Sequence, residues 1–280
     1  MEKHSFQTAT HKLIAGILIF IGFLSFYFAA ELYAEHPDTI KIFNSDECDT
    51  LLSGYYGTGK IDDEDIKTLT EGINFLADSL DKLVFQDKKS RDIKEQNKLL
   101  ILYLEHAEII STIYNYEGMN YQDELIKKTD TDLKRFLTLS DLEGEVYLKY
   151  ADYLYTKLSH SKTKRFNINL TLPVLYRRAL AKDKKNKTAL VKLSCWQISS
   201  ADEVTSNFNS QIRATEKYIE TLNEVDKFNA YIRYSVFYMK IYDTQKGWEY
   251  FYKAKNLFPS HPLLPKLYEN YHKGRFKTGV

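Results

Sequence analysis

The chain has 280 residues, of which 44% are hydrophobic and 28% are charged, and its formal net charge is +1. This length allows one extended domain or two small ones with a substantial core. Lysines and acidic residues alternate along the chain without a domain-wide basic field, so duplex nucleic acid is not expected as a partner, and the Lys184, Lys185 and Lys187 cluster is read as a solvated turn. Glycine and proline are few and helical periodicity dominates, which predicts an all-α protein.

The first predicted element is an apolar segment near the amino terminus. Residues 13–30 carry no charge, and as a helix they would span roughly 27 Å, close to the hydrocarbon thickness of a bilayer. Lysines precede this segment and acidic residues follow it. The positive-inside bias therefore predicts a cytoplasmic tail over 1–12, a transmembrane signal-anchor over 13–34, and a periplasmic or otherwise extracytoplasmic remainder. The alternative is a signal peptide cleaved after Ala30 or Ala34, which would leave a secreted protein.

Residues 35–61 are predicted to be a linker, because they contain turn residues and lack periodicity. Within them, residues 54–60 fit the GxxxxGK pattern of a phosphate-binding loop. However, Ile61 stands where that loop needs Ser or Thr, and four acidic residues follow, so no nucleotide is expected. Residues 62–143 are predicted to form amino-terminal helical hairpins, with helices over about 62–83, 93–116 and 122–137. A further helix over about 142–158 leads into the next region.

Residues 144–274 show a recurring pattern of large and small residues. The clearest unit has one helix with Tyr231, Tyr234, Ser235 and Tyr238 and a second helix with Gly247, Phe251, Ala254 and Pro259. The same spacings return partly at 147–154, 172–179 and 190–197. A basic, polar loop over 159–173 and a degenerate helix over 205–222 interrupt them. A closing helix is expected over 263–271, followed by a tail over 275–280.

This pattern resembles the tetratricopeptide repeat family over residues 144–274. The resemblance implies a right-handed α-solenoid of stacked helix pairs, closed by a capping helix, with a concave groove that binds a protein or peptide. It also implies a scaffold or adaptor rather than an enzyme. A second resemblance is to the T-component of bacterial TRAP transporters, which shares the membrane tether and the tyrosine-rich, irregular repeats. This one implies a small hydrophobic or anionic ligand, although the lipid-bearing cysteine of those proteins is missing here.

Three basic residues form the candidate binding site. In the register of the repeat, Lys149, Lys192 and Arg233 all occupy the sixth position of a first helix. The resemblance implies that this position faces the concave groove, where some members of the family hold a carboxylate of their partner. We therefore expect a ladder of three cations along the groove. The alternative is that these are exposed cations without a partner.

Catalytic and metal-binding patterns are missing from the sequence. No Gly-x-Ser-x-Gly elbow and no His-Glu-x-x-His motif occurs, and the seven histidines are scattered, so neither an enzyme, a metal nor a cofactor is expected. An enzyme without a recognisable motif stays the third alternative. Cys48 and Cys195 are the only cysteines, and the sequence leaves open whether they form a disulfide or two separate thiols.

Overall fold

The computed structural model describes residues 40–87, 89–116, 124–158, 162–200 and 206–276. Its contacts divide the chain into two units, Met1–Lys41 and Ile42–Val280. All described helices belong to the second unit. The predicted cytoplasmic tail and the predicted signal-anchor over 13–34 lie outside the described residues. Among the helices that are described, none is both long enough and apolar enough to cross a membrane.

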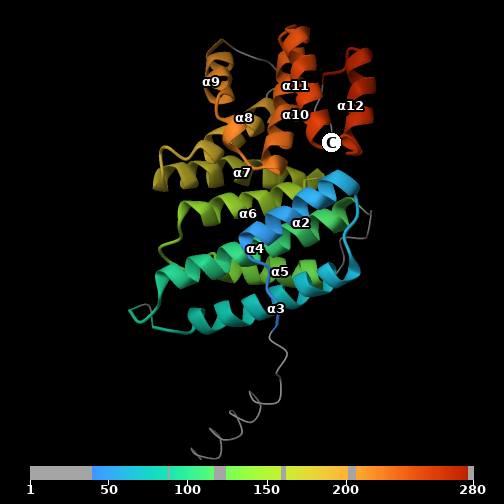
Figure 1. Ribbon diagram of the computed structural model, residues 1–280. Helices are drawn as coiled ribbons and strands as arrows, with labels where there is room; N and C mark the ends of the chain where they lie inside the picture. The colour runs from blue at the N-terminus through green and yellow to red at the C-terminus, as the bar shows by residue number, and fades with distance from the viewer. Residues whose placement is uncertain (1–39, 88, 117–123, 159–161, 201–205, 277–280) are drawn as a thin grey trace, which may run out of the picture. The chain divides into compact units, whose positions relative to one another are not determined.

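The described part of the chain is entirely helical, which confirms the all-α class (Figure 1). Its helices are α2 (Ser45–Thr58), α3 (Asp63–Val84), α4 (Ile93–Tyr116), α5 (Glu124–Phe136), α6 (Gly144–Thr156), α7 (Lys162–Lys182), α8 (Lys187–Ser200), α9 (Ser206–Glu216), the 3-10 helix η1 (Ile219–Thr221), α10 (Glu224–Lys240), α11 (Thr244–Leu257) and α12 (Leu263–His272). The helices predicted over 62–83, 93–116 and 122–137 correspond to α3, α4 and α5.

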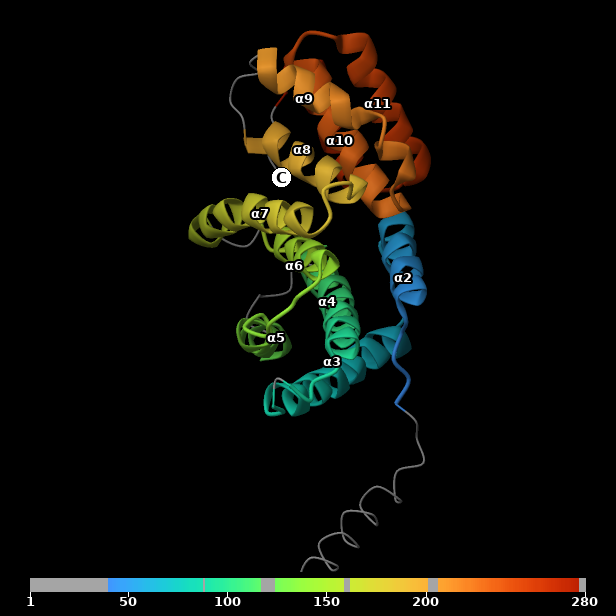
Figure 2. The same cartoon turned by 90° about the vertical axis from the view of Figure 1, so that its left-hand side faces the viewer.

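Neighbouring helices pack as pairs, and the pairs follow one another along the unit. The most extensive packing joins α10 with α11 and α6 with α7, followed equally by α3 with α4 and α4 with α6. Further contacts join α4 to α6, α7 to α8, and α8 to α10, so the pairs form a continuous row (Figures 1 and 2).

The α10–α11 pair shows how the sequence dictates close helix packing. Gly247 lies in the first turn of α11 opposite Met239, and a Cβ atom built at this position would lie 2.9 Å from the Met239 side chain. The missing side chain lets Ser235 donate a hydrogen bond of 2.8 Å to the carbonyl oxygen of Gly247. Ala254 is fully buried in the same pair, at the small-residue position that the repeat pattern predicts.

The structure contradicts the prediction of a linker over 35–61, because helix α2 occupies most of this range. Asn44 and Glu47 cap its first turn reciprocally, and Gly59 ends it in the left-handed conformation with φ of 67°. The apparent phosphate-binding loop is therefore the last turn of a helix. The turn residues conceal an apolar stripe of one residue per turn, Cys48, Leu52 and Tyr55, all of them buried.

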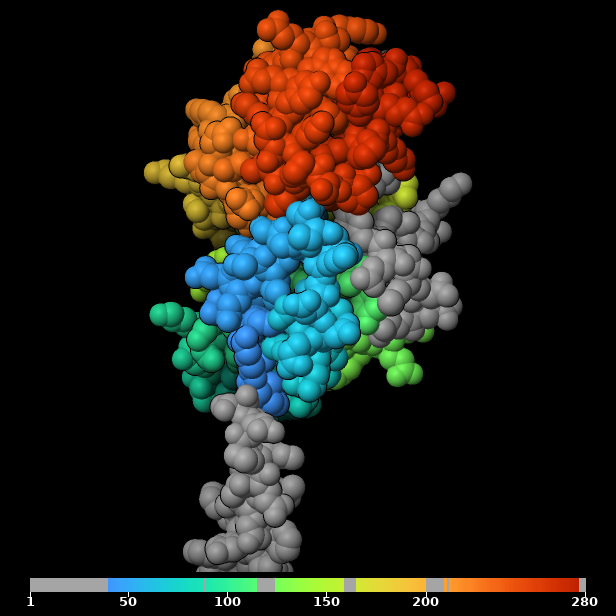
Figure 3. All heavy atoms as spheres, turned by 45° about the vertical axis from the view of Figure 1, so that its right-hand side comes forward, coloured from blue at the N-terminus to red at the C-terminus, as the bar shows by residue number. Residues whose placement is uncertain are grey.

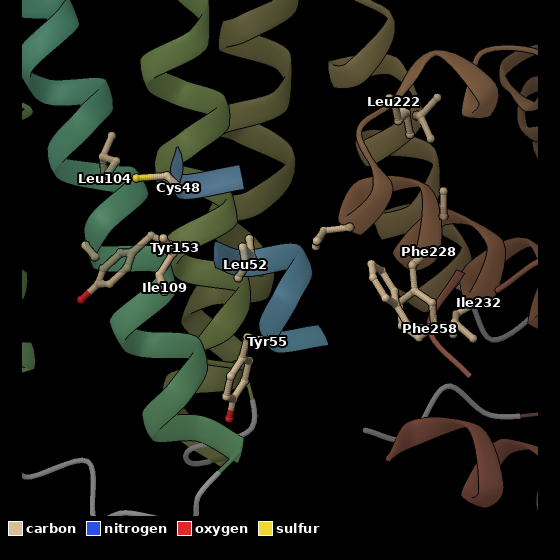
Figure 4. Close-up of a cluster of buried hydrophobic side chains, with 14 of the residues drawn as sticks. Cys48, Leu52, Tyr55, Leu104, Ile109, Tyr153, Leu222, Phe228, Ile232 and Phe258 are labelled. Carbon is tan, nitrogen blue, oxygen red and sulfur yellow. The ribbon is translucent and has the colours of Figure 1, made fainter. Parts of the chain in front are cut away.

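Helix α2 packs against two helices that are far apart in the sequence, α4 and α10. On α4, Ser45 donates a hydrogen bond of 2.8 Å to Glu105, and the side chain of Cys48 points towards Leu104 (Figure 4). At the other end of α2, the Tyr56 ring lies 5.9 Å from the Phe228 ring of α10, measured between centroids. Figure 3 shows the consequence, with α2 and part of α3 lying directly beside the carboxy-terminal helices on one face.

The predicted loop over 159–173 is also wrong for the residues that the structure describes, because α7 begins at Lys162. Pro173 lies inside this helix and cannot donate a hydrogen bond to the carbonyl of Asn169, four residues earlier. The indole nitrogen of Trp196 on α8 donates to that carbonyl instead, over 3.1 Å. A long-range contact therefore satisfies the acceptor that proline leaves open, and no local pattern announces it.

Candidate ligand-binding site

The three predicted cations lie on three helices of the row, Lys149 on α6, Lys192 on α8 and Arg233 on α10. They differ in what surrounds them. Lys149 and Lys192 each form ion pairs with acidic residues of the same chain, whereas Arg233 bonds to a tyrosine hydroxyl. All three residues are half-buried, and the two lysines are in addition paired with acidic residues, so the expectation of three equivalent exposed cations needs correction.

Lys149 joins α6 to α4. Its ammonium lies 2.7 Å from a carboxylate oxygen of Glu105, and the two side chains are only 18% and 4% exposed. Burial lowers the pKa of Lys149, but the neighbouring carboxylates of Glu105 and Glu108 outweigh burial and raise the pKa above its ordinary value. Burial also raises the pKa of Glu108. Because Glu105 also accepts the hydrogen bond from Ser45, this ion pair links α2, α4 and α6.

Lys192 bridges two acidic residues from two other helices. Its ammonium lies 2.7 Å from Asp152 on α6 and 2.8 Å from Asp226 on α10. Burial lowers the pKa of Lys192, and the two carboxylates raise it by more, so the ammonium stays charged. For Asp152, burial raises the pKa although Lys192 opposes the shift. This triad, Asp152–Lys192–Asp226, fastens α6, α8 and α10 together.

Arg233 has a different environment. Its guanidinium donates a hydrogen bond to the Tyr155 hydroxyl and its central carbon lies 5.6 Å from the centroid of that ring. Among the residues that the structure describes, Arg233 forms no ion pair with a carboxylate. The guanidinium remains protonated at any physiological pH. Of the three predicted cations, Arg233 is therefore the one that forms no ion pair with a carboxylate in the described part of the molecule.

A cavity lies beside Arg233 and is lined by residues of α6, α7, α8 and α10 and by Leu222 just before α10. Its empty volume is about 460 Å³, open solvent included. The aromatic side chains of Tyr155, Tyr176 and Trp196 line it, together with the Asn229 amide and the charged residues Asp152, Lys192 and Asp226. A guanidinium beside aromatic walls can hold a carboxylate through charge-assisted hydrogen bonds while the walls take an apolar body.

Cys195 also lines this cavity, but its chemistry does not suit catalysis. Burial raises the pKa of the Cys195 thiol to about 12, so the reactive thiolate does not form near neutral pH. Cys48 is buried, and both cysteines are free thiols, which answers the open question of a disulfide. In the described ranges, no group of three or more histidine, cysteine, aspartate and glutamate side chains could hold a metal ion.

Sequence reasoning missed the acidic half of this site. Asp152 lies three residues after Lys149, on the same side of α6, and this spacing was a usable signal for a charged helix face. Asp226 gave no such signal, because it meets Lys192 only through the packing of α8 against α10.

Comparison with protein-family models, with curated proteins and with solved structures gives no match for this chain. Its function is therefore argued from the geometry of the site.

Proposed function

We propose that the chain is a membrane-anchored adaptor that holds a protein or peptide partner through an acidic group of that partner at Arg233. In this proposal, residues 13–34 form the anchor, the domain lies outside the cytoplasm, and the row of helix pairs is a tetratricopeptide-like solenoid. The pairwise packing of α6 with α7 and of α10 with α11 supports the last part. So does the placement of Lys149, Lys192 and Arg233 on α6, α8 and α10.

The observation that carries the binding role is the guanidinium of Arg233, which is half-buried beside the cavity and forms no ion pair with a described carboxylate. Asp152 and Asp226 line the same cavity, but both already pair with Lys192. A carboxylate of a partner could form two parallel hydrogen bonds with the guanidinium. Lys149 and Lys192 have a different role in this proposal, since they hold the wall of the cavity through Glu105 and the Asp152–Lys192–Asp226 triad.

A second candidate function is the handling of a small hydrophobic or anionic ligand by a transport accessory protein. The aromatic lining of the cavity by Tyr155, Tyr176 and Trp196 favours this candidate, because flat rings suit the apolar body of a small molecule. Both candidates place an anionic group at Arg233. They differ in whether the rest of the ligand is a polypeptide or a small molecule.

The test uses the full chain in its membranes. Crosslinked complexes of the wild type, the Arg233→Gln variant and the Lys255→Gln control are captured and examined for proteins and for small molecules. We expect Arg233→Gln to lose the partner while it keeps the wild-type melting temperature within a few degrees, and Lys255→Gln to behave as wild type. Equal capture by Arg233→Gln would refute the proposed role. A small molecule that co-purifies in an Arg233-dependent way, without a protein, would select the second candidate.

The proposed topology has its own test. Protease added to spheroplasts should remove the domain beyond residue 60 and leave the anchor protected. A domain that resists protease until the cells are lysed would overturn the proposed orientation.

A further inference from the structure

The charge of the chain is distributed unevenly around α7. Residues 153–201 contain eleven lysines and arginines and a single acidic residue, Asp183, a net charge of +10, whereas the whole chain carries only +1. Helix α7 itself has six basic residues and no acidic one. A large excess of one sign on one helix marks a surface that attracts the opposite charge.

The same helix exposes an apolar stripe. Phe166, Leu170 and Val174 are 65%, 59% and 45% exposed, and their spacing of four residues places them on one face. The opposite face of α7 packs into the core through residues such as Leu172 and Ala179, which are 1% and 0% exposed. Figure 2 shows α7 on the left-hand edge of the unit.

Cations accompany the apolar stripe. Arg177 and Arg178 are exposed. Viewed along the helix axis, Arg177 projects from the same face as Phe166 and Leu170, in a direction between theirs. Arg178 lies beside the stripe, with its guanidinium carbon 5.7 Å from the centroid of the Tyr147 ring.

In the described part of the chain, Asp152 and Asp226 approach the inner face of α7 at Tyr176, and other acidic residues lie near its carboxy-terminal end. Asp183 follows the helix directly, and the first turn of α6, which packs beside Ala179 and Lys182, brings the exposed Glu143 and Glu145. The part of the stripe from Phe166 to Val174 is therefore apolar and basic without an acidic counterpart on α7 itself.

We propose that α7 lies on an anionic lipid surface, with Phe166, Leu170 and Val174 in the interfacial region and the arginines at the level of the headgroups. An exposed helix with aromatic and aliphatic residues on one face and lysines and arginines around them is the kind that binds in a membrane interface. Each cation near an anionic surface adds electrostatic attraction, and the apolar stripe adds the burial of hydrocarbon. The inference rests on the charge and exposure of α7 and is independent of Arg233 and its ligand.

An acidic protein surface is the competing partner, and the observations favour lipid. The stripe consists of three exposed apolar residues on a helix at the edge of the unit, and the exposed Arg165 and Arg177 lie towards its two ends. A fluid interface of headgroups and acyl chains can adapt to this edge, whereas a protein partner needs a matching groove. The acidic remainder of a second copy of this chain is the nearest protein candidate, and the experiment distinguishes it.

The experiment places a polarity-sensitive dye beside the stripe without altering it. The full chain carries Asn167→Cys, or the control Asn256→Cys on α11, on a Cys195→Ser background, and both positions are exposed. Each labelled protein is reconstituted into phosphatidylcholine vesicles with or without about 30% phosphatidylglycerol, with brominated lipids as quenchers. We expect quenching at position 167 to be at least about twofold stronger in the anionic vesicles and to vanish in high salt, with no lipid dependence at position 256.

Two variants separate the contributions. Arg177→Gln with Arg178→Gln should remove the dependence on anionic lipid, and Phe166→Ser with Leu170→Ser should remove the quenching in both vesicles. Melting temperatures should stay close to wild type, because all four side chains are exposed. Quenching that is equal in neutral and anionic vesicles overturns the proposal. A dye response that follows protein concentration and not lipid charge also overturns it, in favour of contact between two copies.

Discussion

Replacing Lys192 by methionine tests whether the Asp152–Lys192–Asp226 triad stabilises the fold. The three side chains are 12%, 13% and 19% exposed for Lys192, Asp152 and Asp226, so solvent screens their interaction only weakly. Methionine keeps most of the aliphatic volume of lysine but removes the ammonium, which leaves two buried carboxylates without their cation. Loss of one partner of a buried ion pair costs about 3–5 kcal/mol of unfolding free energy.

The pH dependence of this loss follows from the carboxyl groups. Burial already raises the pKa of Asp152 in the native protein, and Lys192 opposes that shift. Without the ammonium, the folded-state pKa of Asp152 rises further above its unfolded value. A carboxyl group with a raised folded pKa destabilises the folded protein once the pH rises through that pKa. The variant should therefore recover part of its lost unfolding free energy on acidification. We expect a larger deficit at about pH 8 than at about pH 5.

Urea unfolding of the full chain in detergent, followed by far-UV circular dichroism, measures both effects. The exposed Lys255→Met on α11 is the matched control and should change stability by no more than about 0.5 kcal/mol. A neutral triad, with Asp152→Asn and Asp226→Asn added to Lys192→Met, should regain most of the lost stability, because the cost lies in unpaired charge. A deficit below about 1 kcal/mol for Lys192→Met, or one that does not change with pH, would refute this reasoning.

Three further outcomes are expected from the packing and the hydrogen bonds. Ala254→Leu should cost about 1–3 kcal/mol in urea unfolding because the site is fully buried, while the exposed Lys255→Leu should be nearly silent; equal effects would contradict the helix register. Trp196→Phe should cost about 1–3 kcal/mol, since it leaves the carbonyl of Asn169 without a donor, and a neutral result would mean that water replaces the indole. Burial raises the pKa of Glu216, but hydrogen bonds from a lysine and two tyrosines lower the pKa below its ordinary value. The ionised Glu216 side chain therefore stabilises the fold at a pH above its unfolded pKa. This stabilisation is lost as the pH falls through the folded pKa. The melting-temperature difference between wild type and Glu216→Gln should therefore vanish in acid, and a constant difference would speak against the ionic role.

The long amphipathic helices could be predicted from the sequence because their periodicity is local. In α3, an apolar residue recurs every three or four positions from Leu69 to Leu80, and acidic residues mark its amino-terminal end. The same reasoning gave the bounds of α4, whereas the repeat register placed Ala254 in a close helix contact. In each case the information lies within about two turns of the residue concerned.

Helix α2 could not be predicted with the same rules. Its buried residues Cys48, Leu52 and Tyr55 have helical spacing, but Gly54 and Gly57 lower the helix propensity between and after them. What stabilises the helix is the surface of α4 and α10, which lies elsewhere in the sequence. Tertiary packing overrides weak local propensity here.

The basic residues of the candidate site could be predicted from the sequence, but their acidic partners could not. The repeat register placed Lys149, Lys192 and Arg233 at equivalent heights on three helices, and the structure places them on α6, α8 and α10. The register does not contain their counter-charges, because Glu105 and Asp226 come from helices whose neighbours are set by the fold. Only the packing of these helices shows which cation lacks a carboxylate partner in the described part of the molecule.

The position of α2 has a consequence for how the domain folds. A row of helix pairs has mostly local contacts, so its parts can fold and unfold one after another. Helix α2 breaks this independence, because it connects α4 with α10 across more than half of the sequence. The surface on which α2 docks is complete only after α10 has been synthesised and packed. Helix α2 is therefore synthesised early but can dock only late in folding. We therefore expect the row to unfold as one cooperative unit, with α2 as the contact that closes it.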